Sequence, residues 1–177
     1  AGQRISPLDE GNLNRSFGES YTDTPTGCIA AFIAEELFPH CDAVLDLHSG
    51  GSSLNHLSCS YADLGTDKVT AQRTFAALEA MNAPLSWAQS GCPRGPVAGR
   101  AALRKGVIHL SGEFGGGGRL DQGALEVAER CIYRLLDHLG ILPMEEKWRA
   151  DIPTRFVFNI QDHFIYAPQD GVLEPLV

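Results

Sequence analysis

Short apolar segments alternate with helix-like segments along most of the chain, and this alternation restricts the fold more than any other feature. Residues 43–47 and 107–110 form apolar runs that are typical of strands buried inside a parallel sheet. Further strands are predicted near residues 57–61 and 84–88. One helix is predicted to begin at Thr26, a second at Thr66 or Asp67, a short third helix to end near Gly106, and a fourth to span residues 121–139. The alternation predicts an α/β domain with a mostly parallel sheet and helices on both faces.

Apolar residues at helical spacing predict which face of each long helix is buried. The three stripes are Ile29, Phe32, Ile33 and Leu37 in the first helix, Val69, Phe75, Leu78 and Met81 in the second, and Leu125, Ala128, Ile132, Leu135 and Leu139 in the last. Gly140 is predicted to end the last helix, because glycine readily adopts the left-handed conformation that closes a helix.

The chain divides into three predicted parts. Residues 1–142 form the α/β domain, whose first 25 residues read as a loop punctuated by glycine and proline. Residues 143–153 are charged and bounded by prolines, which is typical of a linker. Residues 154–177 hold the alternating segments RFVFNI and FIYAP and the turn QDG, and they are predicted to begin a small β-rich domain. We expect the N-terminal part of the α/β domain and the rest of the β-rich domain to lie outside this sequence.

The composition excludes several classes of protein. Hydrophobic residues make up 44% and charged residues 20% of the 177 residues, as in ordinary globular domains. The formal net charge is -8 and no block of Lys and Arg is present, so we expect neither nucleic acid nor a membrane surface as a partner. No apolar run approaches the roughly 18 residues of a membrane span. The five cysteines show no C-x-x-C spacing, which favours reduced cysteines in a cytoplasmic protein.

Reactive side chains end two of the predicted strands. VLDLH ends in His48 ahead of Ser-Gly-Gly, and VIHLSGE ends in Glu113 ahead of four glycines. Functional residues of parallel α/β sheets gather where strands end. A strand-end imidazole suits a metal ligand, and Asp46 points to the same side of the strand and suits orienting it. Glu113 suits a general base that activates a metal-bound water.

Simpler explanations exist for the same residues. His48 can be a hydrogen-bonded polar residue at a strand end, and Glu113 can be an acidic neighbour of a glycine turn. The glycine run lacks both the Lys-Ser/Thr ending and the G-x-G-x-x-G spacing of phosphate loops, so that signal is weak. His109 lies within an apolar strand and is predicted to belong to the core or to support a ligand.

The loop GNLNRSF places an amide and a guanidinium side by side. Asn14 and Arg15 suit recognition of a carboxylate, because a guanidinium can form two parallel hydrogen bonds with it. Arg4, in the same loop region, can supply a second cation. A loop arginine is also often just solvated.

Taken in order, GNLNRSF, VLDLHSGG and GEFGGGG resemble the motifs of the succinylglutamate desuccinylase/aspartoacylase family of zinc hydrolases, within the metallocarboxypeptidase superfamily. The resemblance spans nearly the whole chain and is greatest to the bacterial branch that contains N-acetyl-diaminobutyrate deacetylases. It implies a zinc-carboxypeptidase-like fold. It also implies a zinc-dependent amidohydrolase that removes an acyl group from a small N-acyl amino acid.

The resemblance also implies a role for each matching residue. His48 matches the third zinc ligand, and Glu113 matches the glutamate that activates the zinc-bound water. Asn14 and Arg15 match the pair that binds the substrate carboxylate, and Arg4 matches an arginine that polarises the scissile acyl carbonyl.

The match departs from the family pattern at several points. Asn12 stands where the family has Asp, and Gly18 follows Phe17 where the family commonly has Pro-Gly. The family's first two zinc ligands form an H-x-x-E motif, and no H-x-x-E occurs in this sequence. The chain by itself therefore cannot supply the three protein ligands of a His₂Glu zinc site.

Two alternatives to the deacylase stay open at this point: a metallocarboxypeptidase acting on peptides, and a metal-free module that binds carboxylates. The acyl group, the amino acid and the oligomeric state, including a homo-oligomer, are also left open by the sequence.

Overall fold

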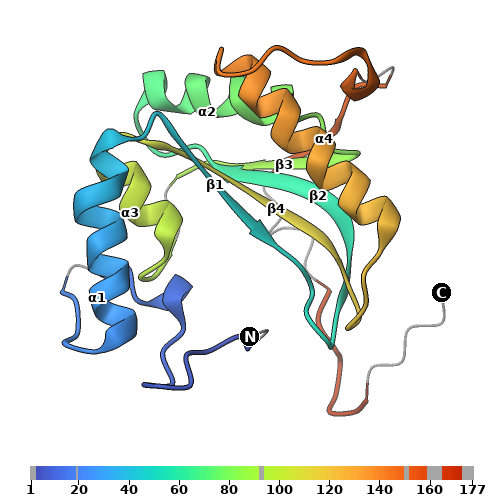
Figure 1. Ribbon diagram of the computed structural model, residues 1–177. Coiled ribbons are helices and arrows are strands. Elements are labelled where there is room, and N and C mark those ends of the chain that lie inside the picture. The colour runs from blue at the N-terminus through green and yellow to red at the C-terminus, as the bar shows by residue number, and fades with distance from the viewer. Residues whose placement is uncertain (1–2, 19, 92–93, 150–151, 159–164, 173–177) are drawn as a thin grey trace.

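The computed structural model describes residues 3–18, 20–91, 94–149, 152–158 and 165–172 (Figure 1). Its five strands form one sheet in the order β1-β4-β2-β3-β5. Their bounds are β1 Ala43–His48, β2 Asn55–Asp63, β3 Leu85–Gln89, β4 Ile108–Gly116 and β5 Arg155–Phe158. The pairs β1–β4, β2–β3 and β3–β5 are parallel, whereas β2 and β4 are antiparallel. The predicted mostly parallel α/β sheet is confirmed, and one antiparallel pair lies inside it.

Four helices accompany the sheet, and side-chain caps mark where three of them begin. Their bounds are α1 Pro25–Phe32, α2 Lys68–Met81, α3 Ala98–Arg104 and α4 Gln122–His138, with single turns η1 Leu13–Arg15, η2 Ile33–Leu37, η3 Phe38–His40 and η4 Glu146–Trp148. Thr24, Asp67 and Asp121 each accept a hydrogen bond from a main-chain N–H in the first turn of α1, α2 and α4. Gly140 follows α4 with a φ of 70°, which confirms it as the predicted stop.

The helices cover both faces of the sheet, as predicted (Figure 1). On one face, α2 and α4 pack against the apolar side chains of β4, which include Ile108, Leu110 and Phe114. On the other face, α1 and α3 form a smaller cluster with Val44 and Val107. That second cluster covers only part of its face, and the rest of the face is available for a cavity. In the described residues no helix is long and apolar enough to cross a membrane.

The predicted buried stripe of the first helix is wrong at three of its four residues, whereas Ile33 packs against the core as predicted. Ile29, Phe32 and Leu37 are 52%, 56% and 45% exposed, whereas Ala30 and Ala34 are fully buried. Small residues allow this helix to approach α3 closely, and α3 itself contributes alanines to the contact.

The predicted stripes of the other two long helices need smaller corrections. In α2, Leu78 and Met81 are buried as predicted, but Val69 is 63% exposed in the first turn. In α4, Leu135 is buried and Ala128 and Leu139 pack against the core as predicted, but Leu125 is 38% exposed. Ala124 and Cys131, which the prediction did not include, are buried as well.

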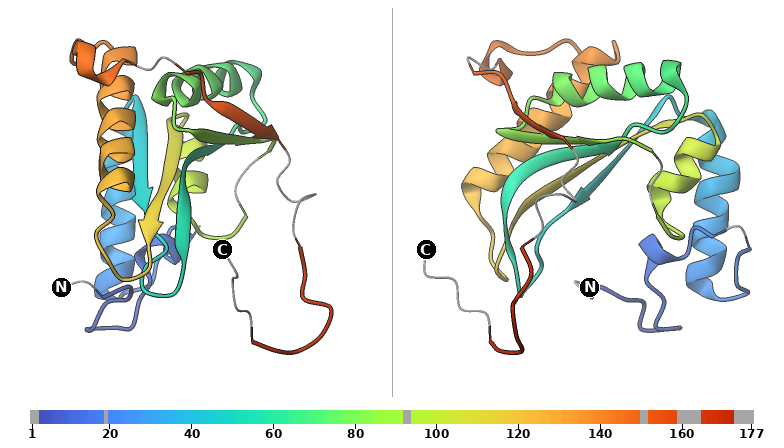
Figure 2. Two further views of the ribbon diagram at one scale, coloured as in Figure 1. Left: turned by 90° about the vertical axis from the view of Figure 1, so that its right-hand side faces the viewer. Right: turned by 180° about the vertical axis from the view of Figure 1, so that it is seen from behind.

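The segment predicted to open a β-rich unit contributes a strand to the same sheet. β5 lies beside β3 at the sheet edge (Figure 2), and Phe156 packs against the core under α2. The predicted strand FIYAP begins at residue 164, which lies outside the described residues, and the described residues 165–167 have no strand structure. The division at residues 143–153 and the β-rich domain stay predictions.

Candidate active site

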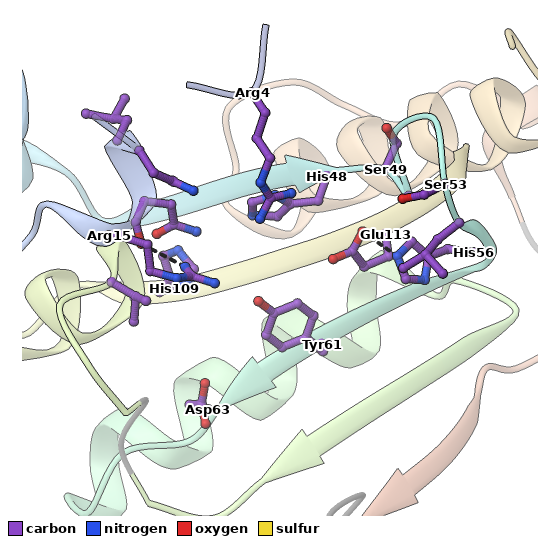
Figure 3. Close-up of a pocket in the computed structure, with 17 residues that line it drawn as sticks. Arg4, Arg15, His48, Ser49, Ser53, His56, Tyr61, Asp63, His109 and Glu113 are labelled. Carbon is purple, nitrogen blue, oxygen red and sulfur yellow. Dashed lines mark hydrogen bonds and ion pairs between the residues drawn. The ribbon is translucent and has the colours of Figure 1, made fainter. Parts of the chain in front are cut away.

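A cavity of about 510 Å³ lies on the face of the sheet opposite α2 and α4. It brings together all five residues that the sequence singles out, which are Arg4, Asn14, Arg15, His48 and Glu113 (Figure 3). These residues come from the N-terminal loop, β1 and β4, so segments far apart in the sequence meet at one place.

The pairing of β1 with β4 sets His48 beside Glu113. The two strands are parallel, and His48 is the register partner of Glu113. Side chains of register partners in neighbouring strands point to the same face, so the imidazole and the carboxylate both face the cavity. Glu113 lies inside β4 rather than at its end, because the strand continues to Gly116. The prediction of a strand ending at Glu113 is therefore wrong by three residues.

Asp46 orients the imidazole of His48. Its Oδ2 lies 2.9 Å from Nε2 of His48, and both side chains are partly buried. This hydrogen bond and the negative charges of Asp46 and Glu113 raise the pKa of His48, although burial opposes the change. Burial alone would raise the pKa of Asp46, but the contact with His48 outweighs it and lowers that pKa. Because Nε2 is engaged, Nδ1 is the ring nitrogen that can act as a ligand.

Asn14 connects this pair to the rest of the cavity wall. Its Nδ2 donates to Oδ2 of Asp46 at 3.4 Å, and its Oδ1 accepts from the main-chain N–H of Ala98 at 2.9 Å. The amide therefore ties β1 to the start of α3. One N–H of the side chain stays available for a substrate, since an amide nitrogen carries two.

The N-terminal loop holds its arginines at the cavity through a few defined contacts. Asp9 accepts from the main-chain N–H and the hydroxyl of Thr26, at 2.7 and 2.8 Å. Gly11 lies so close that a Cβ there would be 2.4 Å from Oγ1 of Thr26. Phe17 is buried and stacks on Phe38. Between these anchors η1 presents Arg15, which binds only a main-chain oxygen of Asn14 among the hydrogen bonds of the described residues.

Three further cavity residues come from β2 and are not predicted as site residues from the sequence: His56, Tyr61 and Asp63 (Figure 3). Nε2 of His56 lies 3.6 Å from Oε2 of Glu113, too far for a hydrogen bond but close enough for an ion pair. That carboxylate oxygen is buried and has no hydrogen-bond partner among the described residues. Glu113 therefore lies beside a basic group and contributes to the lining of the cavity.

β2 reaches the cavity through a register shift. Gly115 of β4 lies opposite His56, and Glu113 lies opposite Cys59. Between these two pairs the chain advances by three positions in β2 but by only two in β4, so β2 contains one extra residue. This is a β-bulge. Beyond it the pairing is regular, with Tyr61 opposite Ser111.

His109 closes the floor of the cavity. It is 8% exposed, and burial lowers its pKa to about 4, so it is neutral at physiological pH. α3 packs directly on its ring, because a Cβ on Gly99 would lie 2.9 Å from Nδ1. His109 thus supports the site from below, in keeping with the prediction that it belongs to the core or supports a ligand.

A metal site is present only in part. Within the described ranges, no three His, Cys, Asp or Glu side chains cluster as a metal ion would require. His48, with its oriented ring and free Nδ1, has the chemistry of a single zinc ligand backed by a carboxylate.

The fold and this cavity define an α/β protein with an Asp-oriented histidine beside a glutamate and two arginines, which is an arrangement suited to hydrolysis. A family model described as the succinylglutamate desuccinylase/aspartoacylase catalytic domain matches residues 1–139. The chain belongs to this family.

Individual relatives agree with this assignment. N-alpha-acetyl-L-2,4-diaminobutyric acid deacetylase of Halomonas elongata is 32% identical over 169 residues, which cover 92% of this chain and 49% of the relative. A succinylglutamate desuccinylase from Silicibacter sp. TM1040 superposes with a TM-score of 0.78 at 33% identity, covering 86% of this chain and 46% of that one. The product-bound ectoine utilization protein EutE (DoeB) of Ruegeria pomeroyi gives 0.77 at 32% identity, with coverages of 89% and 47%. The chain spans about half the length of these relatives.

Proposed function

We propose that this chain forms part of a zinc-dependent amidohydrolase that removes an acyl group from an N-acyl amino acid. The observation that carries the proposal is the meeting of Glu113, the His48–Asp46 pair, Arg4 and Arg15 around one cavity. Membership of a family of desuccinylases and aspartoacylases supports the reaction class. The Halomonas relative, named for an acetylated diamino acid, supports a small-molecule substrate.

Glu113 is the general base in this proposal. Glu113 lines the cavity, and its buried Oε2 has no hydrogen-bond partner in the described part of the chain, so we assign this carboxylate the proton of the attacking water. The same carboxyl group can then pass the proton to the leaving amine. His56, 3.6 Å away, places a basic group beside this carboxylate.

His48 would hold the zinc ion through Nδ1, with Asp46 fixing its ring. A bound zinc ion would lower the pKa of a water toward about 7 and polarise the acyl carbonyl. A cluster of three or more metal-binding side chains is not found among the described residues.

Arg15 and Arg4 bind the two oxygen-rich ends of the substrate. Arg15 offers a guanidinium to the substrate carboxylate, and the remaining N–H of Asn14 adds a second donor. Arg4 enters the cavity from the N-terminal loop and would stabilise negative charge on the acyl oxygen in the transition state.

We further propose that the enzyme acts in the cytoplasm, that residues 143–153 link this domain to a β-rich one, and that its partners are small molecules.

The test is Glu113→Gln in the full-length protein. The substitution keeps the shape of the side chain but removes the base, so we expect kcat to fall about 100- to 10,000-fold while the zinc content, measured by elemental analysis, is unchanged. Glu129→Gln, at an exposed position of α4, is the matched control and should keep wild-type kcat. Near-normal kcat in Glu113→Gln would overturn the assignment of the base.

The substrates in the assay separate the two remaining alternatives. Turnover of N-acetyl amino acids without cleavage of peptides supports the deacylase, and the reverse result identifies a carboxypeptidase. A full-length protein that binds acidic amino acids but contains no zinc would instead be a binding module.

A further inference from the structure

Asp63 differs from Glu113, the other carboxylate that lines the cavity, in its surroundings. It is the last residue of β2, is partly buried, and lines the cavity. Among the described residues it has no hydrogen bond or ion pair, and burial raises its pKa to about 6. A desolvated carboxylate that nothing neutralises is costly to keep in a folded protein, which suggests that its partner is a molecule that enters the cavity.

The position of Asp63 along β2 places it at a defined distance from the proposed base. Cys59 lies opposite Glu113 and Tyr61 lies opposite Ser111, so Asp63 is two residues beyond Tyr61 on the same face. Asp63 is four residues beyond Cys59, which lies opposite Glu113, so the two carboxylates are about 13 Å apart along the strand direction. Figure 3 shows Tyr61 between the two carboxylates. The cavity thus has two separate carboxylates, Glu113 from β4 and Asp63 from the end of β2.

The opposite charges come from another wall. Arg4 and Arg15 enter from the N-terminal loop, so the cations that bind the carboxylate of an amino acid do not contact Asp63. A substrate held by Arg15 and attacked beside Glu113 would extend its side chain along β2. The group that reaches Asp63 should carry a positive charge, because an ammonium group would neutralise the carboxylate and donate hydrogen bonds to it.

We propose that Asp63 determines specificity by binding a positively charged amino group on the side chain of the N-acyl amino acid. The inference rests on the proposed function. In an extended substrate, five bonds of about 1.5 Å separate the acyl carbon from an amino group two methylenes beyond Cα, a span of roughly 6 Å. An ion pair of about 2.8 Å at Asp63 and one water at Glu113 fill the rest of the distance. A side chain of this short length therefore matches the cavity.

The test compares two nearly isosteric substrates on the full-length protein. N-α-acetyl-2,4-diaminobutyrate carries a terminal ammonium where N-acetylnorvaline carries a methyl group. We expect wild-type kcat/KM to favour the diamino substrate by about 10- to 100-fold, as for loss of a hydrogen bond to a charged group. In Asp63→Asn this preference should fall to about threefold or less, chiefly through a higher KM for the diamino substrate, while N-acetylnorvaline is hydrolysed as before. Asp63→Glu, which keeps the charge, should retain part of the preference.

The controls separate the failure of this inference from the failure of the proposed function. Asp42→Asn removes an exposed carboxylate before β1 and should leave both substrates unchanged. An unaltered preference in Asp63→Asn, or an equal loss for both substrates, overturns the specificity role. If the wild type hydrolyses no N-acyl amino acid, the proposed function fails, and calorimetry then tests Asp63 alone. Binding of 2,4-diaminobutyrate that is weakened at least tenfold by Asp63→Asn supports the subsite, and equal binding overturns it.

Discussion

The two faces of β4 differ in what the same strand is used for. Ile108, Leu110 and Phe114 point into the core under α2 and α4, whereas His109 and Glu113 point toward the cavity. Alternate residues of one strand therefore serve burial and chemistry. The apolar face is held by the hydrophobic effect and tolerates no gap. The cavity face keeps buried polar atoms, such as Nε2 of His109 and Oε2 of Glu113, that have no hydrogen-bond partner among the described residues. Residues of β4 that stabilise the core thus alternate with residues that line the cavity.

The sharpest test of this separation is Leu110→Ala. Leu110 is fully buried in the core of the apolar face, so its truncation leaves a cavity, and we expect a loss of about 2 to 5 kcal/mol of unfolding free energy. Urea unfolding measures the loss. Activity per folded molecule, assayed well below the melting temperature, should stay within about twofold. Ile141→Ala, at a side chain 66% exposed, is the control and should change stability by less than about 0.5 kcal/mol. A loss of activity larger than the loss of folded protein would show that the two faces are coupled.

Gly99→Ala tests the cavity face by its packing. The added Cβ would meet Nδ1 of His109 at 2.9 Å, and a buried ring cannot move away easily, so we expect a loss of about 1 to 3 kcal/mol together with a lower kcat/KM. Thermal unfolding and the deacylase assay measure the two effects. Gly123→Ala in α4 is the matched control, because its Cβ meets only Oδ1 of Asp121 at 3.4 Å and alanine favours the helix. If Gly99→Ala were as stable and active as the control, the contact between α3 and His109 would not matter.

Asp63→Asn tests the cost of a charge on the cavity face. The pKa of Asp63 is raised from 3.8 to about 6, so the folded state holds the proton more tightly than the unfolded state. The carboxylate therefore lowers stability fully above about pH 6, and the penalty fades as the pH falls from about 6 to about 4. We expect Asp63→Asn to raise stability on the order of 1 kcal/mol at pH 7.5, after allowing for partial exposure, and to change nothing at pH 3.5.

Thermal unfolding at the two pH values measures this difference without substrate. Asp42→Asn should show no change at either pH, because that carboxylate is exposed. A less stable Asp63→Asn at pH 7.5 would mean that the carboxylate has a stabilising partner. Asp63→Asn would then change both stability and the cavity, unlike Leu110→Ala, which is expected to change stability alone.

The sequence predicts the part of the site that lies on two neighbouring parallel strands. His48 and Glu113 follow apolar runs, and neighbouring parallel strands bring such residues to one edge, so the order of residues along the chain is enough to predict their meeting. Asp46 follows from the same two-residue period. The motifs in their order predict the family, which the family model confirms.

The sequence fails where small residues or non-local pairing decide the structure. The inward faces of α1 and α4 depend on Ala30, Ala124 and Cys131, whose burial a stripe of large apolar residues does not reveal. The cavity residues of β2 depend on its antiparallel pairing with β4, which leaves no local signal in the chain. Asp63 looks like an ordinary polar end of a strand until that pairing is known.

The bulge in β2 determines which of its side chains face the cavity. In a regular strand, residues separated by an odd number of positions point to opposite faces. His56 and Tyr61 are five positions apart, yet both line the cavity, because the extra residue between His56 and Cys59 reverses the parity. Without the bulge, regular pairing of the same residues could keep every hydrogen bond beyond Cys59 and would turn the imidazole of His56 away from Glu113. The surroundings of the proposed base thus depend on the bulge in β2 as much as on the identity of its residues.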